Sequence, residues 1–151
     1  MRDIKFRGKS TETKLHTAQW RFGSLLTPPN EACKPLIYQR FSRPMHDGNG
    51  YWYEVEAETV GQFTGLKDHK GREIYEGDIV KVVSYGEESF HVVKYMIDLD
   101  YPAFDLEPAL DGDFNSLGYC LIDIDTKITV IGNIYDNPEL LRLTKTGGFE
   151  K

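Results

Sequence analysis

Short segments in which apolar and polar residues alternate recur along the chain. In the first of them Ile4 and Phe6 are separated by a basic residue, and such a period of two places neighbouring side chains on opposite faces of a β-strand. Residues 79–83 are apolar except for Lys81, which is typical of a central strand buried on both faces. These patterns predict strands over residues 4–7, 19–26, 36–41, 51–56, 60–64, 79–83, 90–97, 119–124 and 128–135.

Turn-forming residues separate the predicted strands. Combinations of Asp or Asn with Gly predict tight turns over residues 46–50, 68–71 and 76–78. Residues 98–118 are acidic and contain two prolines, so we expect an irregular loop there. A helix is predicted near the end, with Asn137 as its N-cap and Pro138 as its first residue. Residues 77–82 (GDIVKV) resemble the strand entry of SH3-like barrels. We therefore expect a mainly β fold: a small, partly open barrel or two half-barrels, SH3-like in part, with one short C-terminal helix.

Composition limits the class of protein. The chain has 151 residues, 40% of them hydrophobic, and its two cysteines, Cys33 and Cys120, form neither a disulfide framework nor a metal motif. No apolar run approaches the roughly 18 residues of a membrane helix, and the charged N-terminus does not resemble a signal peptide. We expect a cytoplasmic protein that forms a single domain over residues 1–151. Composition shifts suggest a subdivision into residues 1–58, residues 59–143 and a tail over residues 144–151.

Charge is unevenly distributed along the chain. Residues 1–53 hold nine basic and four acidic residues, a balance of +5, whereas residues 54–151 hold nine basic and twenty acidic residues, a balance of −11. A basic segment of this kind can bind phosphate groups. Alternatively, two oppositely charged surfaces attract each other, within one chain or between subunits. The net charge of −6 favours this second interpretation, because an acidic protein repels nucleic acid at long range.

The sequence contains no recognisable catalytic or metal-binding motif. Residues 111–115 (DGDFN) begin like a calcium loop, but Ser116 replaces the glycine of the sixth position and Ile122 the glutamate of the twelfth. The four histidines lack metal-ligand spacing, and no phosphate-binding glycine loop or nucleophile motif occurs. We therefore predict no enzymatic activity, no metal and no cofactor.

Two pairs of aspartates have the spacing of residues on one face of a strand: Asp98 with Asp100, and Asp123 with Asp125. In a strand the two carboxylates of a pair would lie about 7 Å apart, where they could hold Mg²⁺ or perform acid–base hydrolysis. Alternatively, they occupy the solvent face of an edge strand, where charges prevent pairing with another chain. The second interpretation is favoured.

Aromatic and basic residues are interleaved in the first third of the chain. Such surfaces bind single-stranded nucleic acid, because bases stack on aromatic rings while cations contact the backbone. Alternatively, most of these rings fill the core of a small barrel, with Trp52 the ring expected to remain exposed. The candidate binding residues are Trp20, Arg21, Arg40, Arg43, Tyr51 and Trp52.

Four segments carry a family resemblance: residues 1–8 (MRDIKFRG), 19–25 (QWRFGSL), 62–82 (QFTGLKDHKGREIYEGDIVKV) and 130–141 (VIGNIYDNPELL). Their order and the long central string resemble the YopX-like family, small proteins found mostly in phages and integrated mobile elements. The resemblance implies an all-β fold and a phage or prophage origin in a bacterial host. It implies no particular activity.

We expect residues within these segments to have structural roles. Their glycines would set turns, their apolar residues would fill the interior, and Asp78 would cap a turn by accepting backbone N–H groups. These residues are Phe63, Gly65, Asp68, Gly71, Ile74, Tyr75, Gly77, Asp78, Gly132 and Asn133.

Three functions remain open from the sequence. The favoured one is a non-enzymatic binding or assembly module, because open edge strands and oppositely charged segments suit association with a second copy, or with a host or phage protein. A monomer with shielded edges is the alternative to self-association. The second function is single-stranded nucleic-acid binding, and the third is a hydrolase built on the aspartate pairs.

Overall fold

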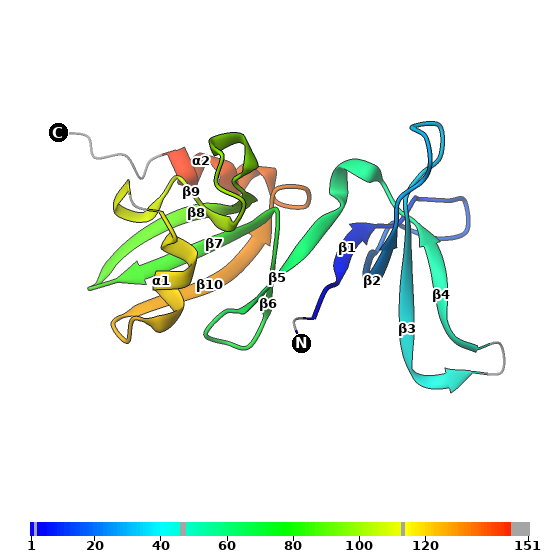
Figure 1. The fold of residues 1–151 in the computed structure, drawn as a ribbon, viewed down its shortest axis with the longest axis horizontal. Helices are drawn as coiled ribbons and strands as arrows, with labels where there is room; N and C mark the ends of the chain where they lie inside the picture. The colour runs from blue at the N-terminus through cyan, green and yellow to red at the C-terminus, as the bar shows by residue number, and fades with distance from the viewer. Residues whose placement is uncertain (2, 46–47, 113, 146–151) are drawn as a thin grey trace. The chain divides into compact units, whose positions relative to one another are not determined.

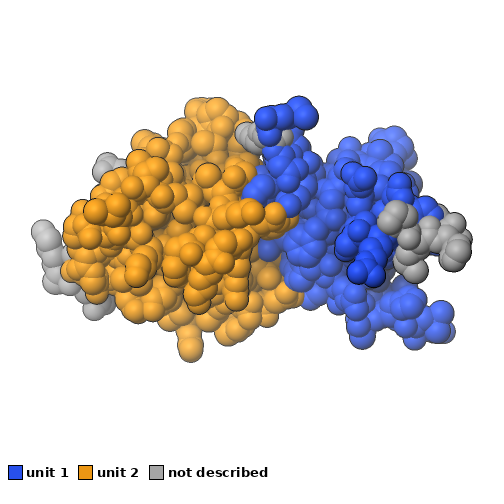
Figure 2. Space-filling view, turned by 90° about the horizontal axis from the view of Figure 1, so that it is seen from below, with its two compact units in different colours: residues 1–63 blue, residues 64–151 orange. Residues whose placement is uncertain are grey.

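The computed structural model describes residues 1, 3–45, 48–112 and 114–145. The chain forms two compact units, unit 1 over residues 1–63 and unit 2 over residues 64–151 (Figures 1 and 2). Both are built mainly from antiparallel strands in sheets that do not close into a barrel, which confirms the mainly β prediction. Residues 46–47 of the predicted first turn and residues 146–151 of the predicted tail lie outside the described residues.

Unit 1 contains the antiparallel strand order β4-β3-β2-β1-β5 (Figure 1). The last of these strands begins in unit 1 and continues into unit 2, where β6 is its neighbour. The elements are β1 (Phe6–Lys9), β2 (Trp20–Leu26), β3 (Leu36–Met45), β4 (Gly48–Glu54), the 3₁₀ turn η1 (Ala57–Thr59) and β5 (Gly61–Lys67).

The apolar core of unit 1 is small. Its buried hydrophobic side chains, among the described residues, are Ile37, Val55 and Phe63. Gly8 on β1 makes this packing possible, since a Cβ there would lie 2.9 Å from Val55 Cβ and 3.1 Å from Ile37 Cδ1. Because few side chains are enclosed, much of the sheet surface faces solvent.

Unit 2 contains a second antiparallel sheet in the order β10-β7-β8-β9. Val80 and Val82 of the central strand β7 are completely buried, as predicted, together with Ile128 of β10 and Val93 of β8. The elements are β6 (Glu73–Tyr75), β7 (Asp78–Ser84), β8 (Glu87–Tyr95), η2 (Ile97–Leu99), β9 (Phe104–Glu107), η3 (Leu110–Gly112), α1 (Ser116–Ile122), β10 (Thr126–Asn133), η4 (Pro138–Leu140) and α2 (Leu141–Lys145).

The prediction of a strand over residues 119–124 is wrong, because this segment belongs largely to helix α1. Leu117 and Cys120, three residues apart, are both buried in the core, which is the spacing of one helix face. The carboxylate of Asp105 on β9 accepts hydrogen bonds from the backbone N–H groups of Asn115 (2.6 Å) and Leu117 (2.9 Å). This buried acid fixes the start of the helix, and nothing in the local pattern indicates it.

The C-terminal helix is confirmed, as the 3₁₀ turn η4 followed by the short helix α2. Pro138 is its first residue, but the Asn137 side chain makes no capping hydrogen bond. Its Oδ1 instead accepts a bond from Asn133 N at 3.3 Å. The absence of a side chain at Gly132 leaves room for this amide, since a Cβ there would lie 2.4 Å from Asn137 Oδ1.

The turn over residues 68–71 is organised by the buried carboxylate of Asp68. It accepts hydrogen bonds from the backbone N–H groups of Lys70 (2.9 Å), Arg72 (2.9 Å) and Val130 (3.0 Å). Gly71 has a φ of +80°, as a turn glycine requires. The carboxylate therefore closes its own turn and joins it to β10.

The next turn has the predicted conformation. Gly77 has a φ of +85°, and Asp78 Oδ2 accepts a hydrogen bond from Tyr75 N at 2.8 Å. Ile74 and Tyr75, which precede this turn, are buried, as expected for interior residues. Gly65 differs from expectation: it lies inside β5 with a φ of +89° and does not form a turn, a conformation that glycine permits within a strand.

Replacing Gly77 with valine should destabilise unit 2 by at least about 2 kcal/mol, because a β-branched residue is strained at positive φ. A Cβ would also lie 3.1 Å from Tyr135 Cε2. Gly86→Val is the matched control, since Gly86 has a φ of +87° and open space around its Cβ position. Chemical denaturation should show a larger loss for Gly77→Val; equal losses would show that contact with Tyr135 is unimportant.

Replacing Asp68 with asparagine should cost about 1–3 kcal/mol, because an amide cannot accept all three backbone bonds. Burial by itself raises the pKa of Asp68, but the hydrogen bonds from Val130, Arg72 and Lys70 outweigh it and lower the pKa below the ordinary value of 3.8. The ionised carboxylate therefore stabilises the fold fully at pH values above the ordinary pKa of 3.8. This contribution is lost as the pH falls through the lower pKa of the folded protein.

Between about pH 5 and about pH 2, the wild type should thus lose more stability than Asp68→Asn, as measured by denaturant titration. Asp125→Asn, at an exposed position in the loop before β10, is the control and should behave like the wild type. If the wild type and Asp125→Asn lose no more stability in acid than Asp68→Asn does, ionisation of Asp68 does not stabilise the fold.

Candidate binding surfaces

Strand alternation divides the six predicted binding residues between the two faces of the unit 1 sheet. Trp52 lies directly opposite Tyr38, and Tyr38 lies opposite Ser24, so these residues share a face. The same alternation along β2 and β3 adds Trp20, Phe22, Leu26 and Arg40. We call this surface the Trp52 face: Trp20, Phe22, Ser24, Leu26, Tyr38, Arg40 and Trp52.

The opposite surface, which we call the Tyr51 face, carries Arg21, Tyr51 and Tyr53. The Arg21 guanidinium lies 3.8 Å from the centre of the Tyr53 ring, and the rings of Tyr51 and Tyr53 are 6.2 Å apart. Arg43 is exposed but lies where the β3–β4 register is irregular, so the register assigns it to neither face. The structure therefore does not bring the six candidates together.

The Trp52 face exposes large apolar side chains. Trp52 is 49% exposed, Phe22 42% and Leu26 51%. The rings of Trp52 and Tyr38 are in contact, with centroids 5.0 Å apart and planes inclined by 47°. Arg40 is exposed on the same strand as Tyr38. Such a surface can stack a planar ligand and place a cation beside it.

Two other basic residues of this region, Arg7 and Arg21, lie against aromatic rings of the protein itself. The Arg7 guanidinium lies 4.7 Å from the centre of the Trp20 ring, and Arg21 stacks on Tyr53. These contacts stabilise the sheet and use the charge internally. Arg40 is therefore better placed than Arg21 to meet a ligand on an exposed ring.

The predicted arrangement of the aspartate pairs is wrong. Asp98 belongs to the 3₁₀ turn η2, and Asp100 follows it with a positive φ of 55°. Asp123 and Asp125 lie in the loop between α1 and β10. Since neither pair lies in a strand, the geometry proposed for a hydrolase does not occur. Within the described ranges, no group of three or more His, Cys, Asp or Glu residues could hold a metal ion.

The two cysteines occupy different environments. Cys33 is exposed, and Cys120 is buried on α1 among core residues. Burial raises the pKa of the Cys120 thiol to about 11, so it is protonated near neutral pH and packs as a small apolar group.

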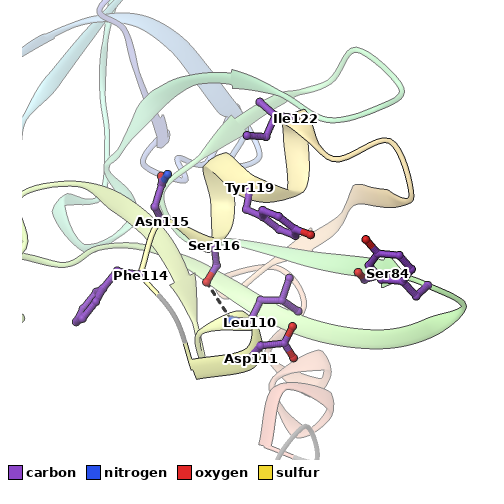
Figure 3. Close-up of a pocket in the computed structure, with 9 residues that line it drawn as sticks. Ser84, Leu110, Asp111, Phe114, Asn115, Ser116, Tyr119 and Ile122 are labelled. Atoms are coloured by element: carbon purple, nitrogen blue, oxygen red, sulfur yellow. Dashed lines mark hydrogen bonds between the residues drawn. The ribbon is translucent and has the colours of Figure 1, made fainter.

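A pocket of about 420 Å³ lies beside α1 in unit 2 (Figure 3). Its walls come from the β7–β8 turn, η3 and the helix. The sequence does not indicate it, because residues 119–124 have the pattern of a strand. The view shows Tyr119 and Asp111 approaching a common space, with Phe114 and Ile122 turned away from its centre. The lining residues are Ser84, Tyr85, Leu110, Asp111, Phe114, Asn115, Ser116, Tyr119 and Ile122.

Two open antiparallel sheets with surface-exposed aromatic side chains define a small, mainly β protein. The chain belongs to the YopX family, since the family model described as YopX protein matches residues 5–142. This confirms the resemblance found in the sequence. In the part of the chain that the structure describes, no helix has the length and apolar character needed to span a membrane.

A solved structure supports the same fold. Protein EF1440 from Enterococcus faecalis, known from a crystal structure, is 27% identical to this chain with a TM-score of 0.53. The alignment covers 92% of this chain and 98% of EF1440. No curated protein is significantly similar to the chain.

Proposed function

We propose that the protein is a non-enzymatic binding or assembly module and that the Trp52 face is its binding surface. The observation that supports this proposal is the ring pair of exposed Trp52 and half-buried Tyr38, which lies on the same sheet face as Phe22 and Arg40. About half of the Trp52 side-chain surface is in contact with water. A ligand or partner that covers this apolar area would gain the free energy of burying it.

Single-stranded nucleic acid is the ligand that this chemistry favours. Each base stacked on a ring contributes roughly 1–3 kcal/mol, and Arg40 could contact the phosphate backbone. The charge of the whole chain, −6, opposes such binding at long range, but residues 1–63 carry nine basic and seven acidic residues, a balance of +2. The repulsion therefore arises from unit 2.

Association with a second copy is the competing use of the same face. Phe22, Leu26 and Trp52 offer apolar contact area, which suits a symmetric interface. YopX family membership supports the further proposal that the protein acts in the cytoplasm of a bacterial host of a phage or prophage.

Nucleic-acid binding can be tested by fluorescence anisotropy of a labelled 12-nucleotide single strand. We expect binding that weakens as salt is raised. Trp52→Ala should weaken it by roughly 5- to 100-fold through loss of stacking, and Arg40→Ala should reduce its salt dependence.

Tyr51→Ala is the matched control, because Tyr51 is the neighbour of Trp52 in β4, is 54% exposed, and points to the opposite face. Equal effects of the two substitutions would exclude the Trp52 face as the site. Light scattering separates assembly from nucleic-acid binding: a mass that rises with concentration and falls in Trp52→Ala, without oligonucleotide binding, would assign the face to self-association.

A further inference from the structure

We propose that the pocket beside α1 in unit 2 binds an organic cation, an ammonium or guanidinium group carried on an apolar stem. This site is separate from the Trp52 face and does not depend on the function proposed for it.

The side chains around the pocket are those that recognise such a cation. Its lining includes the rings of Tyr85 and Tyr119, the carboxylate of Asp111 and, turned away from the centre, the ring of Phe114; among the described residues it includes no basic side chain. Aromatic faces attract cations through the negative charge of the ring face. Phe114 pairs with Tyr101 at a centroid distance of 5.3 Å, so it forms the margin of the site.

These rings are unusually exposed for a folded unit. Tyr85 is 72% exposed, Phe114 70% and Tyr119 43%. The volume of about 420 Å³ lies within the range of pockets that hold small ligands. A cation with an apolar stem would cover ring surface that water otherwise contacts.

The electrostatic environment also favours positive charge. Residues 64–151 hold nine basic and seventeen acidic residues, a balance of −8. A hydrogen bond to Tyr85, followed by the negative charges of Asp123 and Asp111, raises the pKa of Tyr119 above its ordinary value. Of these two carboxylates, that of Asp111 lines the pocket, where a bound cation would offset its charge.

The backbone around the pocket has several left-handed residues. Among the described residues, four non-glycine residues have positive φ, and three of them line this pocket: Tyr85 (49°), Asp111 (53°) and Asn115 (63°). Left-handed conformations of non-glycine residues cluster at binding and active sites, because the surrounding structure has to hold them. Tyr85 has the least tolerant side chain of the three, and it is the first residue of the two-residue β7–β8 turn, in which Gly86 also has a positive φ (87°).

The cation could belong to an arginine or lysine side chain of a protein or to a free polyamine. We suggest an NMR titration of the full chain with N-acetyl-arginine amide, with its neutral analogue N-acetyl-citrulline amide, and with spermidine. The arginine amide should shift the backbone amides of Tyr85, Asp111 and Tyr119, with a dissociation constant on the order of 1 mM. The citrulline amide should leave them unchanged.

Two substitutions test the assigned groups. Asp111→Asn should weaken binding by at least about threefold, and asparagine tolerates the left-handed backbone there. Asp100→Asn is the matched control, because Asp100 is also exposed with a φ of 55° but does not line the pocket. Tyr119→Leu should weaken binding by about two- to fivefold, and its circular dichroism spectrum should match that of the wild type.

Tighter binding of spermidine than of the arginine amide would identify a free polyamine as the ligand, and the reverse order would identify a side chain. The proposal is overturned if neither cation shifts these amides up to 50 mM (about fifty times the expected dissociation constant), if the citrulline amide binds equally well, or if Asp100→Asn and Asp111→Asn weaken binding to the same extent.

Discussion

Buried carboxylates that accept hydrogen bonds from backbone N–H groups hold the loops of unit 2 in place. Asp68, Asp78 and Asp105 are each less than 5% exposed. Asp68 and Asp105 each accept three backbone bonds, and Asp78 accepts one from Tyr75. Burying a charge is costly, and several charge-assisted bonds are needed to offset that cost. The turns and the helix start therefore follow from the positions of these three acids: Asp78 and Asp105 lie on strands, and Asp68 directly follows one.

The buried carboxylates also determine where some surface residues of unit 2 lie. Asp105 fixes the start of α1, and α1 carries Tyr119 into the pocket. Unit 1 has a different basis: its sheet encloses few apolar residues, and aromatic rings pack against one another on its surface. In unit 2 the ring of Tyr119 is placed by a helix whose start a buried carboxylate fixes, whereas in unit 1 the contact between Trp52 and Tyr38 follows from their cross-strand pairing.

The period of two predicted most strands correctly, because alternation survives wherever one face of a sheet is covered. It failed for α1, since a short apolar run fits a helix or a strand, and the deciding contact comes from Asp105 on another element. The same period also indicates that the candidate binding residues cannot all lie on one face. Trp20 with Arg21, and Tyr51 with Trp52, are neighbours in strands and so point to opposite faces. The pocket could not be predicted, because Tyr85, Asp111 and Tyr119 meet only through the fold.

The two proposed surfaces have complementary requirements. The Trp52 face presents the exposed cation of Arg40, in a unit with a balance of +2, and the pocket is suited to a guanidinium group, in a unit with a balance of −8. A second copy of the chain carries both partners of such a contact. Self-association through Arg40 and the pocket would occupy both surfaces at once, so arginine amide would then dissociate the assembly. A nucleic-acid ligand on the Trp52 face would leave the pocket accessible, and arginine amide would not displace it. Competition by this one small cation therefore distinguishes self-association through Arg40 and the pocket from a symmetric contact between two Trp52 faces or a nucleic-acid ligand, neither of which occupies the pocket.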